Sequence, residues 1–88
     1  MKVEFDPKKS VLNLKKHGVA FQEAETVFYD PLSLTREDDE AQDEARLVTV
    51  GQGCLGKILT VVWTHRGENI RLISAREATR NERRAYES

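Results

Sequence analysis

Residues 70–87 read IRLISAREATRNERRAYE, and this stretch contains the change of pattern that decides the fold. Apolar and polar side chains alternate over most of residues 69–75, which predicts a β-strand. The alternation then gives way to an arginine-rich, helix-forming tail. Thr79-Arg80-Asn81-Glu82 fits a capping box, in which the first and last side chains each bind the other residue's backbone N–H, and a helix is predicted over residues 80–87. The stretch therefore predicts a strand that leads directly into a C-terminal helix.

Arginine is concentrated in or beside this stretch, at Arg71, Arg76, Arg80, Arg83 and Arg84. A planar guanidinium group suits phosphate well because it donates two parallel hydrogen bonds. At about 100° per residue, Arg80, Arg83 and Arg84 share one side of the predicted helix. Taken alone, these three residues favour a solvated helix face paired with Glu87 slightly over a phosphate site.

Upstream, the sequence predicts two short helices. Asp6 and Pro7 supply a capping carboxylate and a proline at the first helical position, and Gly18 is a C-terminal stop. The apolar stripe of this first helix consists of Val11, Leu12 and Leu14. Apolar residues at helical spacing predict a second helix over residues 21–28, which Asp30-Pro31 ends.

Strands are predicted for most of the remaining chain. Apolar, β-branched segments separated by glycine-bearing turns lie at residues 46–52, 57–65 and 69–75, and Leu32 and Leu34 alternate with polar residues before them. Such segments predict consecutive antiparallel strands. We expect one α+β domain over residues 1–88, with two N-terminal helices, an antiparallel sheet of about four strands and a C-terminal helix.

The last predicted turn sets the expected register of this sheet. If residues 66–69 form that turn, His65 pairs with Ile70 and the cross-strand neighbours that follow are Trp63 with Leu72 and Val61 with Ser74. One face then carries Trp63, His65, Leu72, Ser74 and Arg76, and the other carries Val62, Arg71, Ile73 and Ala75. This register predicts that Arg76 leaves the sheet on the same face as Trp63 and His65.

The composition is that of an ordinary soluble globular domain, with 39% hydrophobic and 33% charged residues. Because no apolar run is long enough for a signal peptide or a membrane span, we expect a cytoplasmic protein. The net charge of −1 gives no nucleic-acid signal, but charge is unevenly distributed. An acidic run at residues 37–44 is expected to be a solvated loop. The single cysteine, Cys54, has no histidine or arginine near it in sequence and is interpreted as an ordinary loop thiol.

The chemistry available is that of a metal-free site. The single cysteine and the two distant histidines do not match the H-x-x-x-H or C-x-x-C spacing of transition-metal sites. No phosphate-binding glycine loop is present either. Histidines, arginines and lysines together suit RNA cleavage, in which the ribose 2′-OH attacks the adjacent phosphate. That reaction needs a base, an acid and cations for the developing charge. We therefore expect no metal and no cofactor.

The candidate catalytic residues each have a structural alternative. His17 and His65 are candidate proton carriers, yet His17 also suits the C-terminal end of its helix and His65 also suits an exposed turn. Glu82 is explained by the capping box. Trp63 suits a core or an interface anchor better than a base-stacking surface.

Several segments together resemble the BrnT family of bacterial type II toxins over nearly the whole chain. They are Phe5-Asp6-Pro7-Lys8, Asn13-x-x-Lys16-His17-Gly18-Val19, Phe21-x-Glu23-Ala24-x-x-Val27-Phe28-x-Asp30-Pro31, Arg66-Gly67 and Arg71-x-Ile73-Ser74-Ala75-Arg76-x-Ala78-Thr79-x-x-Glu82-Arg83-x-x-Tyr86-Glu87. The resemblance implies a RelE-like ribonuclease fold and translation arrest by RNA cleavage. It further implies neutralisation by a BrnA antitoxin, a heterotetramer with that antitoxin, and operator DNA binding only through it.

The resemblance also implies site residues, which are Lys16, His17, Arg76, Arg80, Glu82 and Arg83. We expect Arg76 with Arg80 or Arg83 on the scissile phosphate and His17 or His65 as the proton carrier. Lys16, Arg71 and Arg84 are expected to bind RNA. Trp63 or the first helix is expected to offer an apolar surface to the antitoxin.

Two functions from different classes follow. The first is a metal-independent endoribonuclease toxin. The second is a non-catalytic module whose basic C-terminal helix holds RNA or an acidic partner segment. Binding through phosphate contacts alone would weaken steeply with salt and leave the RNA intact, whereas an enzyme would release a 2′,3′-cyclic phosphate in the presence of EDTA.

Overall fold

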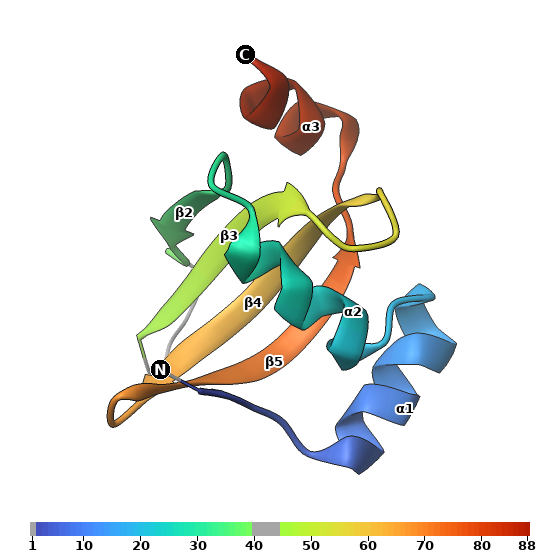
Figure 1. Cartoon of the computed structure of the whole chain (residues 1–88), viewed down its shortest axis with the longest axis vertical. Helices are drawn as coiled ribbons and strands as arrows, with labels where there is room; N and C mark the ends of the chain where they lie inside the picture. Colours follow the sequence, from blue (N-terminus) through green and yellow to red (C-terminus); the bar gives the residue numbers. More distant parts are fainter. Residues whose placement is uncertain (1, 40–44) are drawn as a thin grey trace.

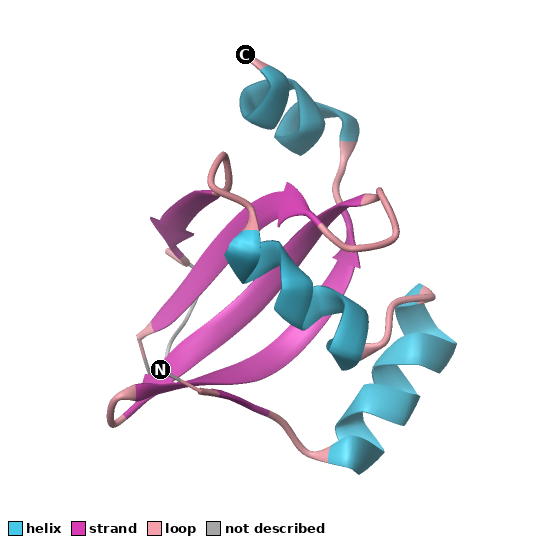
Figure 2. Ribbon diagram, in the orientation of Figure 1, coloured by secondary structure: helices cyan, strands magenta, loops and turns pink. Residues whose placement is uncertain are grey.

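The structure, a computed structural model, describes residues 2–39 and 45–88. They form a five-stranded sheet in the order β1-β5-β4-β3-β2. Helices α2 and η1 lie across one face of the sheet, α1 lies beside β5 and α3 follows β5 at the far end (Figures 1 and 2). The elements are β1 (Val3–Glu4), α1 (Pro7–His17), α2 (Phe21–Glu25), the 3-10 helix η1 (Thr26–Tyr29), β2 (Leu34–Glu37), β3 (Arg46–Gln52), β4 (Ile58–Arg66), β5 (Asn69–Glu77) and α3 (Arg80–Glu87).

The α+β architecture is confirmed, with corrections to its details. The sheet has five strands rather than about four, and it is mixed because β1 runs parallel to β5. The second predicted helix divides at Thr26, where the α-helix tightens into η1. The Thr26 hydroxyl donates to the Glu23 carbonyl (2.6 Å) and accepts the Cys54 N–H (2.7 Å), which fastens this corner to the β3–β4 turn. Of the predicted acidic loop, residues 40–44 lie outside the described residues.

Helix α1 has the predicted ends but an unexpected buried side. The Asp6 carboxylate accepts the Lys8 N–H (2.9 Å), and Gly18 ends the helix in the left-handed region at φ 75°. The buried residues of α1 are Ser10 and Asn13. Its apolar residues Val11, Leu12 and Leu14 are exposed instead.

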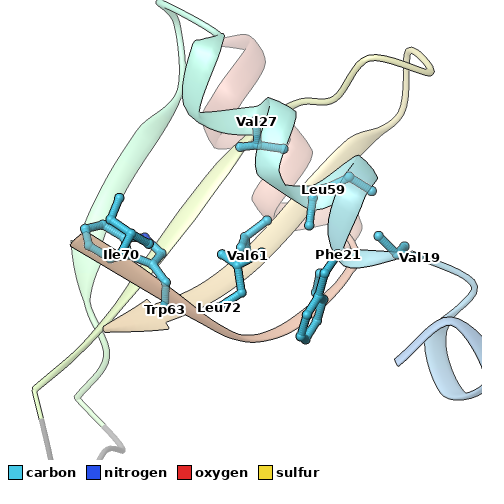
Figure 3. Packing of buried hydrophobic residues seen from close by; sticks show 10 residues of the cluster. Val19, Phe21, Val27, Leu59, Val61, Trp63, Ile70 and Leu72 are labelled. Carbon is cyan, nitrogen blue, oxygen red and sulfur yellow. The ribbon is translucent and has the colours of Figure 1, made fainter. Parts of the chain in front are cut away.

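The core lies between the sheet and α2 with η1 (Figure 3). Its members are Val19, Phe21, Ala24, Val27, Leu59, Val61, Trp63, Ile70, Leu72 and Ala75. Trp63 is 7% exposed, donates its indole N–H to the Thr49 hydroxyl (2.8 Å) and meets the Phe28 ring edge-on. Trp63 is therefore a core anchor, and the expected exposed apolar surface around it is wrong for the free protein.

The register of β4 and β5 agrees with the prediction near the turn and departs from it beyond. His65 pairs with Ile70 and Trp63 with Leu72, as predicted. Val61 pairs with Ala75 rather than Ser74, because the pairing passes over Ile73 in a β-bulge. One extra residue moves every later side chain to the other face. The prediction that Arg76 shares the face of Trp63 and His65 is therefore wrong.

Among the described helices, none is long and apolar enough to cross a membrane.

Candidate phosphate-binding site

The candidate site lies on the open face, defined as the sheet face opposite α2 and η1. Directly paired residues of antiparallel strands point to the same face, so the register arranges this face in three rows. The rows are Leu34, Val50, Thr60 and Arg76; then Arg36, Val48, Val62 and Ser74; then Arg46, Thr64 and Arg71. Strands β2, β3 and β5 therefore all contribute arginines to the open face.

Arg36 and Arg76 line one recess of about 420 Å³ on this face. Val48, Thr60 and Val62 also line the recess, together with Asp38 and Asp39 from the end of β2. The recess thus combines two guanidinium groups and two carboxylates with small polar and apolar side chains. The guanidinium groups are the part of its lining that suits a phosphate.

Arg76 is held in place by Glu82 of α3. Arg76 Nη1 donates a hydrogen bond to Glu82 Oε1 (2.7 Å) and Arg76 Nη2 donates one to Glu82 Oε2 (3.1 Å), so the ion pair is bidentate. Thr60 Oγ1 (3.0 Å) and the Thr79 N–H (2.8 Å) donate to the same carboxylate. The hydrogen bonds from Arg76 are the main reason that the pKa of Glu82 falls to about 2. The pair also raises the pKa of Arg76, so both groups remain charged.

The predicted capping box is confirmed, and the geometry adds a second role for Glu82. Glu82 closes the box with Thr79 and also joins α3 to the sheet through Thr60 and Arg76. Glu82 is therefore a positioning residue for Arg76. The sequence pattern predicted the first role and gave no sign of the second.

A second polar contact joins α3 to the opposite corner of the fold. No residue of α3 is buried, and Tyr86 donates its hydroxyl to the Asp30 carboxylate. Asp30 also accepts the backbone N–H groups of Gln52 (2.8 Å) and Leu32 (2.9 Å). These three donors, the Gln52 N–H foremost, lower the pKa of Asp30, and the same contact raises the pKa of Tyr86. Helix α3 is thus attached by polar side chains rather than by an apolar face.

The three arginines of α3 line a recess that Arg76 does not share. Arg80, Arg83 and Arg84 line a separate recess of about 370 Å³ with Ala78 and Glu87. Glu82 faces the sheet, and positions 80 and 84 lie on the opposite side of a helix from position 82. The structure therefore gathers these three arginines, as predicted, but does not place them on one phosphate with Arg76.

Of the two histidines, His17 lies at the edge of the open face. His17 and Lys16 line a recess of about 270 Å³ that Ser74 also lines. Ser74 pairs with Val62, which lines the recess of Arg76, so the two recesses are neighbours.

His65 lies elsewhere. It stacks edge-on against Trp63 at a centroid distance of 5.1 Å, on the face that Arg76 does not share. Along β4 it lies five residues from Thr60, the partner of Arg76, which is about 17 Å at the rise of a β-strand. The structure does not bring His65 and Arg76 together.

Reasoning from the sequence missed Arg36 and Arg46. Both lie in strands, and the alternation around Leu34 already indicated a strand at Arg36. Both arginines lie on one face because of the way in which β2 pairs with β3. The sequence pattern predicts the two strands but not which of their residues pair. Within residues 2–39 and 45–88, no three histidine, cysteine, aspartate or glutamate side chains gather as a metal site requires.

Comparison with known proteins defines the class. Residues 5–82 match the family model described as the ribonuclease toxin BrnT of type II toxin-antitoxin systems. The fold is similar to the crystal structure of the Brucella abortus ribonuclease toxin BrnT, with a TM-score of 0.66 and 26% sequence identity over 91% of this chain and 99% of that chain. A comparison with curated proteins found no match. The protein is thus a ribonuclease toxin of a type II toxin-antitoxin system. It belongs to the BrnT family.

Proposed function

We propose that the toxin is a metal-independent endoribonuclease that cleaves RNA on the open face of its sheet. The observation that supports this most strongly is the arginine-lined open face, with Arg76 fixed in orientation beside the recess of His17. Arg76 keeps N–H donors that Glu82 does not use, because guanidinium carries five. We assign Arg76 to the scissile phosphate.

The proposed reaction is an internal phosphoryl transfer. A base removes the 2′-OH proton, the 2′-oxygen forms a bond to phosphorus, and the bond from phosphorus to the 5′-oxygen breaks as an acid protonates that oxygen. The products carry a 2′,3′-cyclic phosphate and a 5′-OH. We assign His17 as a proton carrier, because it is the histidine at the edge of the open face. A proton carrier and a positioned cation each contribute about 10²- to 10³-fold, which is enough for a slow toxin.

The other basic residues serve the flanking phosphates in this proposal. Arg71 shares the open face, and Lys16 lines the recess of His17. Arg80, Arg83 and Arg84 form a second cationic surface on α3, in a recess separate from that of Arg76. We place a neighbouring part of the RNA strand there, with Arg80 and Arg83 reaching the scissile phosphate only if α3 turns. His65 is left as a weaker candidate.

The family implies the biological setting that we propose. In this setting RNA cleavage in the cytoplasm inhibits translation, and a BrnA-like antitoxin neutralises the toxin in a heterotetramer that binds operator DNA through the antitoxin. The match to a toxin family of type II toxin-antitoxin systems supports the antitoxin partner. The α+β architecture, in which α2 and η1 cover one face of the sheet, is compatible with a RelE-like ribonuclease fold.

A non-catalytic binding module is the second candidate. Two observations favour it. Arg76 already forms an ion pair with Glu82, and the arginines of α3 line a separate recess. The two candidates differ in turnover. Purified, antitoxin-free protein incubated with RNA in EDTA is expected to release fragments with 2′,3′-cyclic phosphate ends. RNA that is bound in a salt-dependent way and recovered intact would favour the module and contradict cleavage.

A further inference from the structure

Helix α1 exposes aliphatic residues because its buried side is occupied by polar ones. The Asn13 amide donates to the carbonyls of Val19 (2.7 Å) and Ala75 (2.8 Å) and accepts the Ala75 N–H (3.2 Å). The Asn13 amide thereby satisfies the backbone N–H and carbonyl of Ala75 in β5, as the backbone of a neighbouring strand would. Ser10 Oγ likewise accepts the Phe21 N–H (3.0 Å) at the start of α2. The polar side of α1 is therefore structural, and its aliphatic side has no partner within the described chain.

The outer face of α1, defined as Lys8, Val11, Leu12 and Lys15, combines aliphatic and cationic groups. Val11 is 53% exposed and Leu12 is 63% exposed. Lysines occupy the four positions that neighbour Leu12 on a helix, three and four residues away on either side. They are Lys8, Lys9, Lys15 and Lys16. Among the described residues, no carboxylate forms an ion pair with any of them.

This combination favours a protein ligand over RNA. Phosphates are satisfied by lysines alone and gain nothing from exposed valine and leucine, whereas clustered aliphatic residues bordered by charge are typical of protein interfaces. Charge complementarity requires an acidic partner. We propose that the antitoxin docks an acidic segment bearing aliphatic residues on the outer face of α1. This inference rests on the proposed neutralisation by an antitoxin and not on the proposed cleavage chemistry.

The position of the outer face also explains how docking inhibits the toxin. Leu12 lines the recess of Lys16 and His17. An acidic segment seated on α1 therefore lies at the mouth of that recess and competes with RNA phosphates for Lys16. Neutralisation then requires no movement of Arg76 or α3.

The test compares antitoxin affinity for two matched variants. The probe is the antitoxin encoded beside the toxin gene, purified and titrated onto immobilised full-length toxin. The double variant Val11→Glu/Lys15→Glu changes two exposed residues of α1 that line neither recess of the open face. The control Leu55→Glu/Lys57→Glu makes a similar aliphatic-to-acidic and basic-to-acidic change in the β3–β4 turn, where Leu55 is 69% exposed, and it removes only the long, exposed Lys57–Glu77 contact (3.9 Å). We expect the dissociation constant to rise about tenfold or more for the first variant and to stay unchanged for the control.

A milder variant and a check of folding separate a local effect on binding from unfolding of α1. The milder variant Lys8→Gln/Lys15→Gln is expected to reduce the salt dependence of antitoxin binding, and its circular dichroism melt checks that α1 remains folded. Equal affinity of both glutamate variants for the antitoxin overturns the proposal. So does loss of RNA binding with antitoxin affinity intact, because the outer face would then be an RNA surface. Absence of RNA cleavage by the unmodified toxin contradicts the proposed function and leaves the affinity comparison unaffected.

Discussion

Replacing the Glu82 carboxylate with a neutral amide should show how much its ion pair with Arg76 contributes to the free energy of unfolding. Glu82→Gln keeps the shape of the side chain and an oxygen for the donors Thr60 and Thr79, but it removes the charge that holds Arg76. The pKa of Glu82 falls from 4.5 to about 2 in the folded protein. At about 1.4 kcal/mol per pKa unit, that shift corresponds to at most about 3.5 kcal/mol of stability. Because the Glu82 side chain is 18% exposed and that of Arg76 is 41% exposed, solvent screening reduces our expectation to about 1–2 kcal/mol.

The sign of the pH dependence follows from the lowered pKa. A carboxyl group with a depressed folded-state pKa stabilises the fold above its unfolded pKa and loses that contribution as the pH falls towards its folded pKa. Urea denaturation should therefore show the unmodified protein about 1–2 kcal/mol more stable than Glu82→Gln at pH 7, with a gap that narrows steadily from pH 5 to pH 2.5. Asp30 also titrates in acid, but it does so in both proteins and cancels in the difference.

A matched control separates this ion pair from charge in general. Glu87 pairs with Arg83 at 3.9 Å, with both side chains 59% exposed. Glu87→Gln should therefore change stability by less than about 0.5 kcal/mol at any pH. If the gap between the unmodified protein and Glu82→Gln is the same at pH 7 and pH 3, the ion pair does not hold α3 and the role given to Glu82 is refuted.

Three further predictions concern the site and the fold. The double variant Arg76→Ala/Arg80→Ala should abolish growth arrest in cells while it still binds antitoxin, and undiminished toxicity would show that neither arginine acts on RNA. His17→Gln should lower cleavage by about 10²-fold and flatten its pH profile, whereas His65→Gln should leave both nearly unchanged; the reverse pattern would exchange their roles. Asn13→Ala should destabilise the fold by about 2–4 kcal/mol, because it leaves the Ala75 backbone groups and the Val19 carbonyl unpaired, and a melting temperature within a few degrees of the original would contradict the role of this amide.

The features predicted correctly from the sequence depend on residues close together in the chain. The Asp6 cap, the Gly18 stop and the capping box of Thr79 with Glu82 each involve side chains within a few residues of the backbone groups that they satisfy. The pairing of His65 with Ile70 follows from the turn between them. Sequence rules suffice for such features because a cap or a tight turn is decided by residues within the same short segment.

The features that the sequence did not predict depend on distant partners. The adjacent apolar residues Leu72 and Ile73 interrupt the alternation of β5, but such a pair does not by itself show that the strand bulges there and moves Arg76 to the open face. Asn13 is buried because of Ala75, which is 62 residues away. The two errors have the same cause, since the face that a residue occupies is decided by the element that packs against it. For the candidate site, the gathering of arginines on α3 was predictable, but the open face with Arg36 was not.

The central claim is that RNA is cleaved on the open face by its own 2′-OH, with Arg76 on the phosphate. The most direct test uses an RNA oligonucleotide with one mapped cleavage position and a copy that carries 2′-deoxyribose at that position alone, each incubated with antitoxin-free toxin in EDTA. We predict cleavage of the first to a 2′,3′-cyclic phosphate, no cleavage of the second, and no cleavage of either by Arg76→Ala. Cleavage of both oligonucleotides, or equal cleavage by Arg76→Ala, would contradict the account.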